Sequence, residues 1–160
     1  MNQNLDNYLV EKYPKIFVNR YADMKTTAMV WGFDHEDGWF WILDQLCDSI
    51  QNYIDYNYHK NISQVIADQV KEKFGTLSFY YHGGDDYIDG MVRLAENMSA
   101  NVCEFCGSTK NVGRTKGWIS TICKECYSSS DERISQRPWE ENQNIKELRK
   151  FKIKQINKKL

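Results

Sequence analysis

The sequence predicts an α+β fold in which a short antiparallel β-sheet packs with two or three helices, followed by a zinc ribbon and a basic C-terminal helix or tail. Three observations support this. An amphipathic helical segment precedes two β-rich runs. Two C-x2-C pairs then follow, with sixteen residues between them. The end of the chain is rich in lysine. We expect a core domain over residues 1–100, the zinc ribbon over 101–128, and a polar connector with the basic segment over 129–160.

The first half of the core contains two predicted helices. Residues 4–13 form a short helix that ends before Pro14, because the residue preceding a proline avoids the helical region. A buried strand is expected over 28–33. The clearest helix covers 37–58 with Asp37 as its N-cap, since apolar residues recur there at steps of three and four. These residues are Trp39, Ile42, Leu43, Leu46, Cys47, Ile50, Tyr53 and Ile54.

The second half of the core is predicted to be a hairpin and a helix. Two β-rich runs, over 65–73 and 76–81, meet at a Phe-Gly turn. A polar HGGDD segment then ends the second strand. The helix that follows covers 86–100, and Asp86 with Asp89 resembles a capping pair at its start.

The two C-x2-C pairs are the strongest chemical signal in the chain. Two closely spaced thiolates on each of two facing turns can complete a tetrahedron around one Zn²⁺. Backbone amides in such turns support the sulfur ligands. Four protein ligands leave no open coordination position, so the predicted zinc is structural and not catalytic. The predicted ligands are Cys103, Cys106, Cys123 and Cys126.

The histidine pattern argues against zinc enzymes. A zinc deaminase needs H-x-E upstream of P-C-x-x-C and an open metal position, and this sequence lacks both motifs. A nuclease built on a zinc ribbon would need histidines near or after the cysteines, whereas all three histidines precede Cys103. We therefore expect a non-enzymatic protein. His35 and His82 lie beside acidic residues, which suits either a second metal site or, as we expect, two solvated loops.

The segment between the cysteine pairs is a predicted hairpin with basic and aromatic side chains. Arg114, Lys116 and Trp118 fit the usual pattern of phosphate contacts combined with base stacking. The alternative is that Trp118 packs against the core domain. We favour this alternative, because so small a ribbon needs a large apolar residue to dock.

Aromatic residues are dense over 39–58 and 79–87. Aromatic side chains most often fill the hydrophobic core, and they also line pockets for planar ligands. No glycine-rich phosphate loop or dinucleotide fingerprint is present, so a nucleotide pocket is one hypothesis among others. The residues that would serve such a pocket are Trp39, Lys71, Lys73 and Arg93.

Charge is divided unevenly along the chain, although the net charge is only −1. Residues 1–100 carry eight Lys+Arg and fifteen Asp+Glu, whereas residues 101–160 carry thirteen and seven. Pro138 suits the first position of a helix, so residues 139–160 are expected to form the basic helix or a loosely ordered tail. The basic part is suited to nucleic acid, to an acidic protein surface, or to the acidic core within one molecule or across a homodimer.

The sequence also bears on the compartment. No apolar run approaches the roughly 18 residues that span a bilayer, and the first residues lack the basic and apolar regions of a signal peptide. The cysteines form a metal pattern and not a disulfide framework. We expect a cytoplasmic protein that makes no membrane contact.

Four blocks of sequence, taken together, resemble a widespread group of small proteins that bacteriophages and prophages carry. The likeness covers residues 10–127 and lies in the order DGWFWILDQLCDSIQ, VKEKFGTLSFYY, AENMSANVCEFCG and GWISTICKEC. That family has no settled activity, so the resemblance implies a genomic setting and an accessory role in the host cytoplasm. The basic segment beyond about residue 135 is not part of the likeness.

The leading expectation is a phage-encoded, non-enzymatic zinc-ribbon protein that binds a host protein and inhibits a component of antiviral defence. Two alternatives remain open. A sequestering protein would hold a nucleotide immune signal in an aromatic pocket, and the ligand would stabilise its folded state. A nucleic-acid-binding accessory protein would act through the ribbon and the tail, with a steep dependence on salt.

Overall fold

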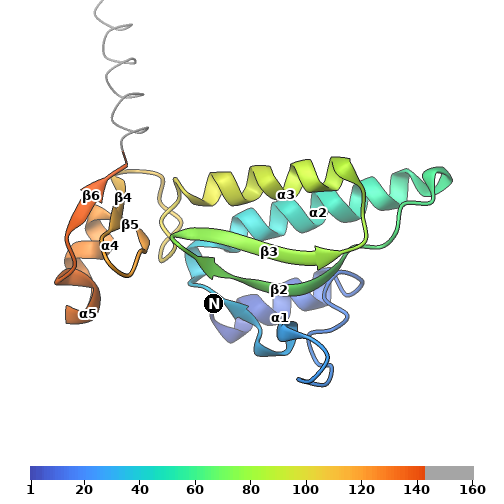
Figure 1. The fold of residues 1–160 in the computed structure, drawn as a ribbon, viewed down its shortest axis with the longest axis horizontal. Helices are drawn as coiled ribbons and strands as arrows, with labels where there is room; N and C mark the ends of the chain where they lie inside the picture. The colour runs from blue at the N-terminus through green and yellow to red at the C-terminus, as the bar shows by residue number, and fades with distance from the viewer. Residues whose placement is uncertain (143–160) are drawn as a thin grey trace, which may run out of the picture.

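The structure is a computed structural model that describes residues 1–142, and these residues contain two small sheets (Figure 1). In the first sheet, β1 (Phe33–Asp34) runs parallel to β2 (Ile66–Lys73), and β2 pairs antiparallel with β3 (Thr76–His82). The predicted α+β class is confirmed. The sheet is mixed and not wholly antiparallel, because the short strand β1 joins it in the parallel direction.

Three helices flank the first sheet. Helices α2 (Phe40–Tyr56) and α3 (Asp86–Ser99) lie together on one side of it, and α1 (Gln3–Lys12) lies on the other (Figure 1). Short 3₁₀ turns, at Ala28–Trp31, Asp37–Trp39 and Tyr58–Lys60, connect these elements. Within the described residues, no helix has both the length and the apolar character needed to cross a membrane.

The second sheet has the strand order β5–β4–β6 and includes the cysteine-bearing segments. Its elements are β4 (Val112–Thr115), β5 (Thr121–Cys123), α4 (Lys124–Ser129), α5 (Glu132–Ser135) and β6 (Trp139–Glu141). Both neighbours pair antiparallel with β4. This sheet is located at one end of the first sheet, beside the turn between β2 and β3 (Figure 1).

Helical spacing builds the main core as predicted. The buried residues of α2 and α3 recur at steps of one, three and four, so each helix buries one face against the sheet. They are Ile42, Leu43, Leu46, Cys47 and Ile50 in α2, and Ile88, Val92, Ala95 and Ser99 in α3. Trp41 and Tyr56 lie off that stripe and are 60% and 80% exposed, so the outer face of α2 is uncovered in the described part of the chain.

Three local predictions are wrong by one or a few residues. The expected strand over 28–33 is mainly a 3₁₀ turn, because Gly32 adopts a φ of 79° and leaves only two residues for β1. Asp37 does not cap α2, since its carboxylate accepts hydrogen bonds from the backbone and side-chain amides of Asn2, each at 2.7 Å. Asp85, and not Asp86, is the N-cap of α3 and accepts from two backbone amides of its first turn.

The predicted start of the basic helix at Pro138 is also wrong. Residues 139–141 form the strand β6, and the indole N–H of Trp139 donates to the carbonyl oxygen of Ile122 at 3.1 Å. The second sheet therefore needs residues beyond 128, and we use the term "ribbon" below for residues 101–142. The rest of the expected basic helix or tail, residues 143–160, lies outside the described residues.

Candidate metal centre and the adjoining cavity

The four predicted ligands converge on one point. The Sγ atoms of Cys103, Cys106, Cys123 and Cys126 all lie within 4.8 Å of one another. The Sγ atoms of Cys106 and Cys123 are 3.7 Å apart, close to the roughly 3.8 Å edge of a tetrahedron with Zn–S distances of about 2.3 Å. The four thiols therefore fit one tetrahedral zinc ion, and they are the only group of this kind among the described residues.

Two different turns hold the cysteines in place. In the first knuckle, Gly107 has a φ of 75° and its amide donates to the carbonyl oxygen of Cys103 at 2.9 Å. In the second, Cys123 ends β5 and is the N-cap of α4, and its sulfur accepts from the backbone amide of Cys126 at 3.4 Å. Amide donors of this kind stabilise thiolate charge, as a metal site requires.

The cysteine thiols differ in acidity. Burial raises the pKa of Cys123 to about 11 and holds the pKa of Cys126 above its usual range. Burial also disfavours the Cys106 thiolate, but hydrogen bonds from the Ser108 amide and from the other thiols outweigh it and lower the pKa of Cys106. Zinc binding must therefore displace protons from the ligands, so zinc affinity falls in acid.

The ribbon docks on the core domain through two glycines. The amide of Gly38 donates to the carbonyl oxygen of Glu104 at 2.6 Å. The carbonyl oxygen of Gly75, in the β2–β3 turn, accepts from the Thr121 hydroxyl at 2.5 Å. A Cβ atom at Gly38 would lie 2.2 Å from the carbonyl oxygen of Cys103, so only glycine allows this approach of the two backbones.

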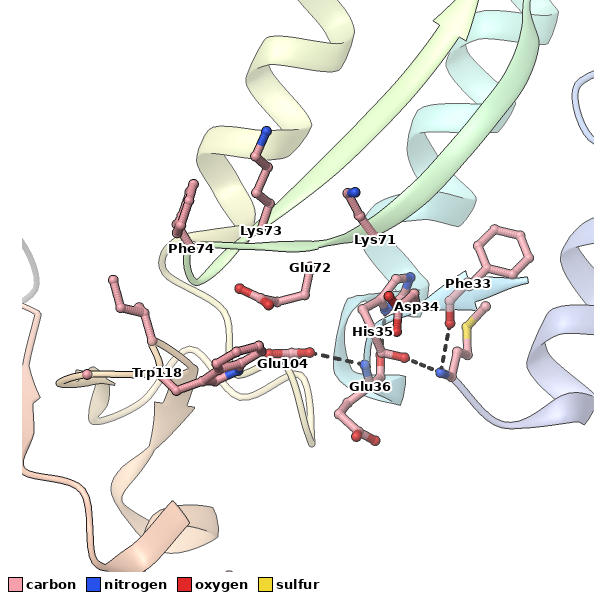
Figure 2. Close-up of a pocket in the computed structure, with 13 residues that line it drawn as sticks. Phe33, Asp34, His35, Glu36, Lys71, Glu72, Lys73, Phe74, Glu104 and Trp118 are labelled. Carbon is pink, nitrogen blue, oxygen red and sulfur yellow. Dashed lines mark hydrogen bonds between the residues drawn. The ribbon is translucent and has the colours of Figure 1, made fainter. Parts of the chain in front are cut away.

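A cavity of about 640 Å³ lies between the ribbon and the core domain (Figure 2). Its volume falls in the range of small-ligand and side-chain binding sites. The walls come from Met1, from β1 and the residues after it, from the end of β2 and the β2–β3 turn, from Glu104, and from the loop between β4 and β5. The lining residues include Phe33, Asp34, His35, Glu36, Lys71, Glu72, Lys73, Phe74, Glu104, Trp118 and Ile119.

Two aromatic side chains stand at the cavity with large exposed surfaces. Phe74 comes from the β2–β3 turn and Trp118 from the ribbon loop, and each is 72% exposed. The expectation that Trp118 packs against the core domain is wrong, because Ile119 and Thr121 meet the β2–β3 turn in its place. The indole of Trp118 is therefore left free to contact a ligand.

The polar part of the cavity wall is acidic. Glu104 is 6% exposed, and burial raises its pKa to about 7. One of its carboxylate oxygens accepts from the amide of Glu36 at 3.3 Å, as Figure 2 shows. Glu72 accepts from the amide of Gly75 at 2.5 Å. Sequence reasoning missed Phe74, Glu72 and Glu104 as site residues, since nothing in their spacing links the β2–β3 turn to the first cysteine knuckle.

The two lysines predicted for a phosphate site line the cavity with their stems. Their ammonium groups lie over the ring of Tyr80, 5.6 Å from its centroid for Lys71 and 5.7 Å for Lys73. Lys73 also donates to the Tyr80 hydroxyl at 3.0 Å. In Figure 2 both lysine heads point away from Glu104 and Trp118. The positive charges are thus turned away from the acidic wall.

The structure scatters the other predicted contact residues. Trp39 is fully buried in the main core, where its indole N–H donates to the carbonyl oxygen of Val102 at 3.0 Å. Arg93 is exposed on α3 and does not line the cavity. Arg114 lies on β4 with its Nε buried and without a hydrogen-bond partner among residues 1–142. Lys116 forms an ion pair with Glu140 at 2.6 Å.

The expectation that His35 is a solvated loop residue is wrong. It is 6% exposed and packs beside Phe33 and Trp39. Burial lowers its pKa to about 4. His82 matches the expectation more closely, since it is largely exposed and its ring pairs with Asp68 at 3.0 Å. The two histidines belong to no cluster of potential metal ligands within residues 1–142.

The buried imidazole makes folding stability depend on pH. Because the pKa of His35 is about 4 when folded and about 6.5 when unfolded, the unfolded chain takes up the proton first. The stabilisation is complete above pH 6.5 and is lost as the pH falls to 4, by about 3 kcal/mol in total. We expect urea unfolding of His35→Gln to show a smaller loss over this range.

Acid also protonates the zinc ligands in both proteins. The unfolding free energies of the parent and of His35→Gln are therefore compared with each other at each pH. The difference between their unfolding free energies should shrink between pH 6.5 and pH 4. A constant difference across this range would contradict a neutral, buried His35.

Comparison with protein-family models, with curated proteins and with solved structures found no match. The cysteine cluster is therefore the feature with the clearest chemistry: it makes the chain a candidate zinc-binding protein, with the C-x2-C pairs brought together as the sequence predicts.

Proposed function

We propose that this chain is a non-enzymatic zinc-ribbon binding protein that captures a protein partner in the cavity between the ribbon and the core domain. The observation that carries the proposal is the pair of exposed aromatic side chains, Phe74 and Trp118, at that cavity. Aromatic side chains are enriched at the centres of protein interfaces. The zinc site supports the role indirectly, because it folds the ribbon that carries Trp118.

The backbone at Phe74 strengthens the proposal. Its φ is 53°, in the left-handed region that bulky residues rarely adopt. The two other non-glycine residues with positive φ in the described chain, Asn61 and Asn111, are of the type that tolerates it. Phe74 therefore occupies an unfavourable conformation with its apolar ring in water, and such a departure from local preference motivates a functional explanation.

The biological setting of the proposal comes from the resemblance to phage and prophage proteins. In that setting the partner is a host protein in the cytoplasm, and the chain acts as an inhibitor of an antiviral defence component. The charges at the cavity support a protein partner over a sequestered nucleotide, because the lysine heads lie at Tyr80 while carboxylates line the wall. The pairing of Lys116 with Glu140 likewise gives little support to a phosphate contact by the ribbon hairpin.

The test is capture of a stoichiometric partner from bacterial host lysate by the tagged protein and its variants. We expect Trp118→Ala and Phe74→Asn each to lose the partner, because each removes one aromatic side chain from the cavity. Tyr56→Ala is the matched control: this residue is 80% exposed on α2 and does not line the cavity, so the partner should remain. Equal capture by all four proteins would contradict the proposed site.

Phe74→Asn has a second expected effect: it should raise the stability of the fold although it removes binding of the partner. Positive φ at both Phe74 and Gly75 defines a two-residue turn that favours Asn-Gly. We therefore expect the variant to be more stable than the parent by about 0.5–1 kcal/mol in urea unfolding. Lost binding together with raised stability would separate a functional role of Phe74 from a structural one.

A further inference from the structure

The acidic side chains at the cavity form no ion pair within the described chain. Glu36, Glu72 and Glu104 all line it. Each of the ion pairs found within residues 1–142 joins other residues. The amino group of Met1, which also lines the cavity, donates to the carbonyl oxygens of Phe33 and His35. The cavity therefore has an excess of hydrogen-bond acceptors, of which Glu104 is only partly ionised near pH 7, because burial raises its pKa to about 7.

His35 adds a further acceptor that is independent of the carboxylates. Its Nδ1 lies 2.7 Å from the carbonyl oxygen of Glu36, which can only accept, so Nδ1 carries the proton. The Nε2 atom is then an acceptor without a proton, and it is buried without a hydrogen-bond partner in the described part of the chain. Buried polar atoms are nearly always satisfied, so the unpartnered Nε2 of His35, a residue that lines the cavity, points to a missing hydrogen-bond donor.

A ligand that suits this cavity is cationic, rich in donors and flat. The acceptors are complementary to a ligand with several N–H groups. The exposed faces of Trp118 and Phe74 are complementary to a cation that stacks on aromatic rings. A guanidinium group has five donors in one plane and stacks in this way, whereas an ammonium group is a compact point charge. We infer that the cavity takes an arginine side chain from the surface of the partner protein; this inference rests on the proposed function.

The test uses the full-length, zinc-loaded chain and short blocked peptides as probes. The peptides are N-acetyl-Leu-X-Leu-amide, with arginine, lysine or citrulline at X; citrulline keeps the shape of arginine but lacks its charge. Binding is followed by NMR through the indole N–H signal of Trp118. We expect saturable shifts with the arginine peptide, and binding at least about tenfold weaker with citrulline and with lysine.

Glu72→Gln supplies the matched change in the protein. Glutamine keeps an oxygen that can accept from the Gly75 amide but removes the negative charge. We expect Glu72→Gln to weaken the binding of the arginine peptide by at least about tenfold. The near-UV circular dichroism spectrum of the protein should stay unchanged. Asp48→Asn is the control, since Asp48 is on α2 and does not line the cavity; its affinity should equal that of the parent.

Three results would overturn the inference. The first is equal affinity for the arginine and citrulline peptides. The second is an unchanged affinity for the arginine peptide in Glu72→Gln. The third is binding of free arginine as tight as that of the arginine peptide, which would indicate a small-molecule ligand. Failure of this inference is distinct from failure of the proposed function. A partner that still depends on Trp118 while no arginine peptide binds would retain the interface and exclude arginine as its ligand.

Discussion

Cys106→Ser should release the metal and unfold the ribbon while the core domain stays folded. The ribbon buries only two apolar residues besides its ligands, Val112 and Ile122, which is too small a core to fold alone. Zinc binding in comparable modules contributes on the order of 10–16 kcal/mol and is coupled to folding. The core domain has a separate buried cluster that includes Trp39 and Phe17.

Zinc content per chain and NMR signals of the two parts would test this expectation. We expect about one zinc in the parent and none in Cys106→Ser, with signals of β4 and β5 collapsing and those of α2 and α3 retained. Cys47→Ala is the control, because Cys47 is buried in the main core away from the cluster. A Cys106→Ser protein with full zinc content and unchanged stability would refute the assignment of the site.

Gly38→Ala should separate the ribbon from the core domain without removing the metal. The added Cβ would meet three backbone atoms of the first cysteine knuckle at 2.2–2.6 Å. No side chain can rotate away to relieve these clashes, so the two backbones must move apart and the bond from Gly38 to Glu104 is lost. We expect a loss of about 3 kcal/mol or more in urea unfolding, with zinc retained.

Gly90→Ala is the matched substitution for this experiment. Gly90 is within α3 and a Cβ there would meet nothing within 4 Å. Alanine at an open helical position should raise stability by about 0.5–1 kcal/mol. Opposite signs for the two glycine-to-alanine changes are the expected result. A mild effect of Gly38→Ala, similar in size to that of Gly90→Ala, would show that the docking is looser than described.

Local spacing explains what could be predicted from the sequence. The stripe from Ile42 to Ile50 produces α2, and the β-rich runs around Phe74-Gly75 produce the β2–β3 hairpin. The cysteine pairs could also be predicted from local sequence, because a spacing of two residues between two cysteines places both thiols on one turn that can bind a metal. Each of these features depends on neighbours within a few turns of the chain.

Features that depend on distant contacts were missed or misjudged. Strand β6 pairs with β4 through residues that lie 24 or more positions apart. Judged from its neighbours alone, Trp139 resembles the start of a helix, because it follows Pro138. The loop that holds the buried His35 also depends on a distant contact, because the amino group of Met1, 34 positions away, donates to the His35 carbonyl oxygen. The cavity is assembled from five separate stretches of the chain, at residues 1, 33–36, 71–74, 104 and 117–119, so no window of sequence contains it.

The two docking points of the ribbon have a kinetic consequence. Gly38 and Gly75 hold the ribbon from two places on the core domain, one before α2 and one in the β2–β3 turn. Because the ribbon is attached at two separate points, it cannot rotate about either one of them. The spacing between Phe74 and Trp118 is therefore set before any partner binds. Association should then proceed in one step without a slow closing motion, and little entropy is lost in ordering the site.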